Sequence, residues 1–420
     1  MESSKLTQKT LRAVVDELPR AEWLDAEMPF SDFERIEGTG RWPANASFLH
    51  HLSVKDSSLQ ANARLTFFRK CTAPSLRHFE AGLSFMNWIP GALPVSLTTL
   101  YVQNTRYSSE VTSVENVVDV LQCLPHLEWL TLHMVLESVS GPGTASPPHK
   151  RVALPHLHTL CLVDSAIPCV RLFQSLVFSA AQTEMVLDFG SVYSTSSMAI
   201  APIIVGLVRE ISPDAIVIRD HCCRSFDCTV YNTTATFAPQ SGAESHTYHV
   251  RPLLRVKGTI ASFVDDYPIV SQNTPSLATN LCNTVLSCLQ SVTTCSLYLT
   301  ASRTDPIWDQ IAQALPKVTV LYTSKFSALM ASLGAVASPS SDAPQYRMAH
   351  VTQLNLLNVH FGGAGWKVNT KQLVPLLSSR KEGGCTPIDR ITLDGCVNLT
   401  ALDVDILRES VQDVHVVIER

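Results

Sequence analysis

The fold is decided by two phrases that lie 30 residues apart, LPHLEWLTL at Leu124–Leu132 and LPHLHTLCL at Leu154–Leu162. Within the first phrase Leu130 and Leu132 are two residues apart, so a pleated strand points both side chains to one face and turns Trp129 to the other. Each phrase therefore predicts a short strand with one buried face.

Weaker forms of this phrase recur along the chain in the pattern apolar-x-x-apolar-x-apolar. The leucines that open the N-terminal forms are Leu49, Leu76, Leu97, Leu127 and Leu157, which follow one another in steps of 27, 21, 30 and 30 residues. These steps are close to the leucine-rich-repeat period of roughly 20 to 29 residues. The C-terminal part carries the phrase again at residues 294–299, 318–321, 351–356 and 388–393. We expect the following strand residues to be buried: Leu52, Leu100, Leu130, Leu132, Leu160, Leu162, Leu354, Leu356, Ile391 and Leu393.

The segments between the phrases carry a helical period instead. Ser113, Thr274–Pro275 and Asp305–Pro306 each offer a helix start before apolar residues that recur every three or four positions. A strand, loop and helix cannot bury their apolar faces alone, whereas stacked units can. Because strands lie about 4.8 Å apart and packed helices about 8 to 10 Å apart, such a stack must curve. The predicted fold class is therefore α/β, a curved leucine-rich-repeat solenoid with a parallel sheet on its concave face and helices on its convex face.

This reading gives a simple domain organisation. Residues 1–45 are expected to form an N-terminal helical cap and linker, with a helix around residues 6–18, and residues 46–420 to form one degenerate repeat array. The array is expected to be irregular at about 220–272. Two stretches rich in Ser, Pro, Gly or Ala, 138–149 and 335–345, are interpreted as loop insertions.

Composition limits the possible partners and compartments. The chain has 420 residues, of which 45% are hydrophobic and 16% charged, which predicts a large core. Its net charge of −5 provides no basic stripe, so neither nucleic acid nor membrane is an expected partner. The chain has twelve cysteines, and those such as Cys123, Cys161 and Cys295 sit singly in apolar runs, which is typical of reduced thiols in a cytoplasmic or nuclear protein. The N-terminus lacks a signal-peptide pattern, and the apolar stretch 198–208 is too short to cross a bilayer.

The sequence contains no recognised catalytic signature, so we do not expect an enzyme. There is no nucleophile elbow, phosphate-binding loop, zinc-protease helix or dinucleotide fingerprint. The cluster of His221, Cys222, Cys223 and Cys228 lacks the second ligand pair that zinc sites use, and is interpreted as structural thiols. No cofactor and no metal are expected.

Side chains opposite the buried strand residues are the candidate binding residues. A row of aromatic, amide and oppositely charged groups suits a folded protein or a peptide better than a nucleic acid, whose phosphates require clustered Lys and Arg. Trp129 is the strongest candidate, because a few large aromatic residues carry most interface energy. The predicted protein-binding residues on one concave surface are Lys55, His78, Glu80, Tyr101, Trp129, Thr131, His133, Thr159, Gln353, Asn355, Arg390 and Thr392.

The phrases at Leu124–Leu132 and Leu154–Asp164 resemble the repeat half of the fungal F-box/leucine-rich-repeat protein family, whose units are long, irregular and led by proline. That resemblance implies substrate-binding repeats of a ubiquitin-ligase adaptor, whose F-box docks on a Skp adaptor and a cullin-RING ligase. The F-box itself is not found, because Val14–Pro19 has the wrong residue order. The expected function is thus a non-catalytic protein-recognition module. The alternatives are a free-standing repeat scaffold or inhibitor and, less favoured, an enzyme with an unrecognised site.

Overall fold

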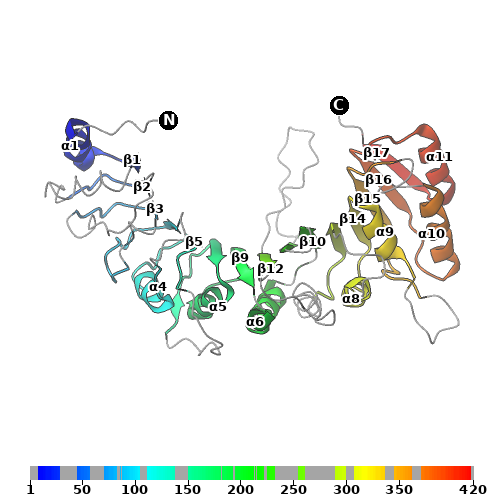
Figure 1. The fold of residues 1–420 in the computed structure, drawn as a ribbon, viewed down its shortest axis with the longest axis horizontal. Helices are drawn as coiled ribbons and strands as arrows, with labels where there is room; N and C mark the ends of the chain where they lie inside the picture. Colours follow the sequence, from blue (N-terminus) through cyan, green and yellow to red (C-terminus); the bar gives the residue numbers. More distant parts are fainter. Residues whose placement is uncertain are drawn as a thin grey trace, which may run out of the picture. The chain divides into compact units, whose positions relative to one another are not determined.

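The computed structural model consists of strands and helices, and strands follow one another directly among its described elements from β1 to β4 and from β10 to β13 (Figure 1). The structure describes residues 8–28, 45–56, 71–82, 86, 88–104, 111–137, 150–180, 182–192, 194–211, 213, 215–221, 225–231, 254–260, 289–298, 307–335, 345–361 and 370–417. The chain divides into two units, Met1–Ser191 and Val192–Arg420. Both are mixed α/β structures built on parallel strands, as the sequence predicts at the level of fold class.

The first unit is built on a parallel sheet whose strands follow the chain order. Its strands are β1 (Trp23–Met28), β2 (His51–Asp56), β3 (His78–Gly82), β4 (Thr99–Gln103), β5 (Trp129–His133), β7 (Thr159–Asp164) and β9 (Glu184–Val192). A small parallel pair is formed by β6 (Val152–Ala153) and β8 (Leu176–Val177). The helices are α1 (Gln8–Glu17), the 3-10 helix η1 (Leu18–Arg20), α4 (Val114–Leu121) and α5 (Ala166–Ser175).

One hydrogen-bond pattern precedes successive strands of this sheet. Before β5 the amide of Leu127 donates to the carbonyl of Leu124 at 3.2 Å, which closes a tight turn. Before β7 the carbonyl of Glu128 accepts from two amides, those of His158 at 2.7 Å and Thr159 at 3.0 Å. The same turn and the same forked carbonyl occur together at the entry of β2, β3, β4, β5 and β7. The chain therefore enters each strand in the same way, although the sequence repeats are degenerate.

The core of both units consists of the apolar residues that point to one side of the strands. Strands β3, β4, β5 and β7 alternate between buried and less buried residues, as a half-buried strand must. All ten residues predicted to be buried are at most 2% exposed. The register predicted from the leucine phrases is confirmed.

Helix α4 shows how a single polar residue starts a helix between two strands. The Ser113 side-chain oxygen accepts a hydrogen bond from the Asn116 amide at 3.2 Å, satisfying one of the free donors at the helix start. Val117, Val118 and Leu121 then form its buried stripe. This helix was predicted, whereas the helix predicted after Thr274–Pro275 lies outside the described residues.

The second unit contains an antiparallel part and a parallel part. Strands β10 (Ala215–His221), β11 (Ser225–Tyr231) and β12 (Leu254–Ile260) pair antiparallel, and β10 also pairs in parallel with β13 (Thr294–Tyr298). Parallel pairing continues through β14 (Val320–Thr323), β15 (Gln353–Leu357), β16 (Arg390–Asp394) and β17 (Asp413–Val417). The helices are α6 (Ser194–Ile211), α8 (Ile307–Ala314), α9 (Phe326–Leu333), α10 (Thr370–Glu382) and α11 (Ala401–Ser410). In Figure 1, α8 to α11 lie along one side of the strands β14 to β17, each packed on the next.

Two parts of the expected organisation differ from the structure. Residues 1–45 were assigned to a helical cap and linker; α1 and η1 fit that description, whereas Trp23–Met28 is a strand of the sheet, and residues 29–44 lie outside the described residues. Within the stretch 220–272 that was expected to be irregular, Ser225–Tyr231 and Leu254–Ile260 form regular antiparallel strands. Residues 138–149 and most of 335–345 lie outside the described residues.

Candidate protein-binding face

The strands of the first unit bring the residues that alternate with the core residues into register on the sheet face opposite the leucines; most of them are half-buried or exposed, and Ser53 is buried. We call this surface the polar face. Its first row contains Trp23, His51, His78, Thr99, Trp129 and Thr159, and its second row contains Asp25, Ser53, Glu80, Tyr101, Thr131 and Cys161. The next alternate positions add the pairs Glu27–Lys55 and Gln103–His133. The pairs follow from parallel registry, which places residues of equal rank side by side about 4.8 Å apart.

The predicted binding residues fall into two sets. The larger set lies on the polar face of the first unit and consists of Lys55, His78, Glu80, Tyr101, Trp129, Thr131, His133 and Thr159. Gln353, Asn355, Arg390 and Thr392 lie in paired rows of β15 and β16 in the second unit. There Arg390 donates from Nε to Asp413 Oδ2 at 2.8 Å on an exposed surface. The predicted face is therefore present in each unit separately.

Three aromatic rings stack at one end of the polar face. The Trp23 and His51 ring centroids are 3.3 Å apart with their planes 5° from parallel, and the His51 and His78 centroids are 4.1 Å apart at 10°. Burial lowers the pKa of both histidines, and the neighbouring His78 lowers the pKa of His51 further. The stack thus favours neutral imidazoles.

The pH dependence of this stack can be predicted. An unfolded histidine has a pKa near about 6.5, so the unfolded chain binds more protons than the native stack just below that pH. Its contribution to stability is therefore fully present above about pH 6.5 and decreases as the pH falls. NMR titration of the His51 and His78 ring protons should give midpoints below about 6.5, and Trp23→Ala should raise the His51 midpoint by admitting water. Midpoints at or above that value would contradict the stacked geometry.

Polar side chains at the centre of the face are held in fixed positions. Lys55 Nζ lies 3.1 Å from Glu80 Oε1, and Ser53 Oγ donates to Glu80 Oε2 at 3.2 Å. The hydrogen bond to Glu80 raises the pKa of Lys55. Next to them, Tyr101 donates its hydroxyl to Gln103 Oε1 at 2.9 Å, and burial raises its pKa. Groups held in this way suit recognition, because little side-chain entropy is lost when a partner binds.

Trp129 is the most prominent large side chain at the middle of the face. It is 50% exposed although its strand neighbours Leu130 and Leu132 are at most 1% exposed. An indole in this position offers a large rigid surface and a hydrogen-bond donor. The structure thus places Trp129 where alternation predicts it.

Trp23 and Asp25, which β1 adds to this face, were not among the predicted binding residues. The signal was present in Trp23–Met28, because Leu24 and Ala26 alternate with Trp23, Asp25 and Glu27. The segment was overlooked because it carries no leucine phrase.

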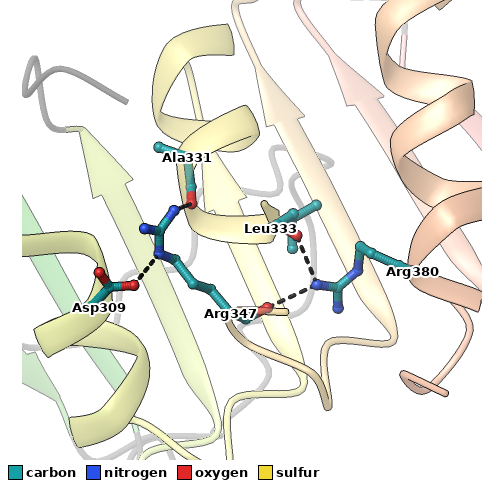
Figure 2. A network of polar contacts seen from close by, with 5 residues as sticks. All are labelled: Asp309, Ala331, Leu333, Arg347 and Arg380. Carbon is teal, nitrogen blue, oxygen red and sulfur yellow. Dashed lines mark hydrogen bonds and ion pairs between the residues drawn. The ribbon is translucent and has the colours of Figure 1, made fainter. Parts of the chain in front are cut away.

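A second polar cluster lies inside the second unit and joins three helices (Figure 2). Arg347, 6% exposed, donates from Nε to Asp309 Oδ1 of α8 at 2.6 Å and from a terminal nitrogen to the Ala331 carbonyl of α9 at 3.0 Å. Arg380 of α10 is 2% exposed and donates to the carbonyls of Leu333 at 3.0 Å, Arg347 at 2.7 Å and Met348 at 2.9 Å. Its burial makes this cluster a structural clasp, which a substrate could not reach.

Metal binding and cysteine nucleophilicity find little support in the part of the chain that the structure describes. That part contains no group of three or more His, Cys, Asp or Glu side chains able to hold a metal ion. Cys71, Cys169 and Cys295 are buried free thiols, and burial raises the pKa of Cys71 to about 11. Thiols of this kind stay protonated and are poor nucleophiles at neutral pH. Cys222 and Cys223 lie outside the described residues.

Among the described helices, none is both long and apolar enough to cross a membrane. Neither a scan against protein-family models nor a search of curated proteins finds a match for this chain.

Proposed function

We propose that the chain is a non-catalytic protein-recognition module that binds a partner polypeptide with the polar face of its first unit. The observation that carries this proposal is the exposed indole of Trp129 on a sheet face that also carries fixed polar groups. Interface energy concentrates in such aromatic anchors, and the surrounding polar groups provide the directional contacts that give specificity.

We further propose that both units are leucine-rich-repeat solenoids. The repeated turn and forked carbonyl support this assignment, because a backbone pattern that recurs strand after strand is the mark of one structural unit repeated. In the second unit the carbonyls of Thr293, Thr319 and Thr352 each accept from the two amides that open the next strand. Function as the substrate-binding repeats of a ubiquitin-ligase adaptor, in the cytoplasm or nucleus, is the proposal that the repeat phrases favour.

Site-specific photocrosslinking tests the proposed function. p-Benzoylphenylalanine is placed at position 101 on the polar face, where Tyr101 already supplies an aromatic ring of similar shape. The matched control carries it at position 122, where Gln122 is exposed at the end of α4. After irradiation in a cell extract, position 101 should give discrete polypeptide adducts that position 122 does not give. Identical adducts from both positions, or none from position 101, would contradict the proposal.

A further inference from the structure

Strand β1 carries a linear strip of three exposed side chains on the polar face. Trp23, Asp25 and Glu27 alternate with the inward-facing residues of the strand, so consecutive members are about 6.6 to 6.8 Å apart. Trp23 is 66% exposed although its ring stacks on His51. A large indole surface is therefore available beside two carboxylates.

The charge of this part of the face is negative. Glu80 is engaged by Lys55 at 3.1 Å, so this ion pair is close to neutral. Lys55 also lies in register opposite Glu27, so this one lysine faces three carboxylates, and Asp25, Glu27, Glu80 and Lys55 together leave a local excess of two negative charges beside Trp23. Phosphate-bearing partners such as nucleic acid or an anionic membrane would be repelled here.

The position of β1 favours an extended partner. Among the described strands, β1 pairs only with β2 and is the first in the order of the sheet. An extended peptide along β1 repeats its side chains with the same two-residue spacing as the strip, so alternate residues of the peptide face Trp23, Asp25 and Glu27.

Arginine is the side chain that can interact favourably with all three members of the strip, the indole and the two carboxylates. Its planar guanidinium stacks on an indole and forms paired hydrogen bonds with a carboxylate, whereas a lysine ammonium acts as a point charge. Resting on the proposed function, we propose that β1 docks an extended segment of the partner polypeptide with arginine at alternate positions. One guanidinium stacks on Trp23, and the next two pair with Asp25 and Glu27.

Fluorescence anisotropy with synthetic peptides tests this inference on the full chain. The probes are fluorescein-labelled nonapeptides with arginine, lysine or glutamate at three alternate positions among serine and glycine. The arginine peptide should bind most tightly, the lysine peptide more weakly and the glutamate peptide not at all. The double variant Asp25→Asn/Glu27→Gln should weaken binding of the arginine peptide by about tenfold, because two exposed ion pairs are lost. Trp23→Ala should abolish the preference for arginine over lysine.

The control variant Glu382→Gln/Glu409→Gln removes two exposed carboxylates from the second unit and should bind like the unaltered chain. Thermal unfolding of each variant establishes that the exposed substitutions leave the fold intact. Equal binding of arginine and glutamate peptides, or undiminished binding by Asp25→Asn/Glu27→Gln, would overturn the inference. If the peptides fail while position 101 still gives specific adducts, the arginine segment is wrong and the proposed function stands. If both fail, the proposed function falls as well.

Discussion

Replacement of Arg380 by methionine should lower the free energy of unfolding of the second unit by about 3 to 5 kcal/mol. Arg380 donates to the carbonyls of Leu333, Arg347 and Met348, and it is 2% exposed. Methionine keeps the apolar stem but removes the guanidinium donor from the buried carbonyls of Leu333 and Arg347, and each unsatisfied group costs about 1 to 3 kcal/mol. The Met348 carbonyl still accepts a hydrogen bond from the Val351 amide at 3.2 Å.

Part of this loss of unfolding free energy is offset, because the substitution also removes a buried charge. Burial lowers the pKa of the Arg380 guanidinium, and the carbonyl groups stabilise its charge only in part. Removing the charge therefore recovers some desolvation energy, which is why the expected loss stays below the upper limit of about 6 kcal/mol for two unsatisfied carbonyls. The cost remains large because Leu333 ends α9, so the guanidinium also caps the negative end of that helix.

Urea denaturation followed by circular dichroism measures this effect. The matched control is Arg408→Met, because Arg408 lies on α11 in an exposed ion pair with Asp405 at 3.5 Å. Its loss should change stability by less than about 0.5 kcal/mol. A loss below about 1 kcal/mol for Arg380→Met would mean that water satisfies the carbonyls and that the clasp contributes little.

The strands of the repeats could be predicted because their signal is local. In Leu130–Leu132 and Leu160–Leu162 a period of two specifies both the strand and its buried face, and these leucines are indeed at most 1% exposed. The same alternation placed Tyr101 and Trp129 on the polar face. The start of α4 could be predicted from Ser113 for an equally local reason, because an N-cap side chain accepts its hydrogen bond from an amide in the first turn of the same helix.

Features that depend on distant partners could not be predicted in this way. Arg380 stands in the charged run Arg380–Glu382, which looks like a solvent-exposed helix end, yet tertiary packing buries it against carbonyls more than 30 residues away. The antiparallel pairing of β10, β11 and β12 likewise depends on contacts between strands, and their sequences carry no leucine phrase. The stacking of Trp23 on His51 also joins residues of two different strands.

Replacement of Trp129 by alanine should weaken partner binding by about 2 kcal/mol, or roughly thirtyfold, because aromatic anchors at the middle of an interface carry energy of this size. The fold should be unaffected. Trp129 is 50% exposed, so its truncation opens no cavity in the leucine core. Leu402→Ala is the matched control, because Leu402 is 69% exposed on α11 in the second unit.

Quantitative recovery of partner polypeptides from cell extract by the immobilised chain is the most direct test of recognition through the polar face. The unaltered chain and Leu402→Ala should recover the same polypeptides in equal amounts, and Trp129→Ala should lose most of them while unfolding at the same temperature. Full recovery by Trp129→Ala would contradict the account.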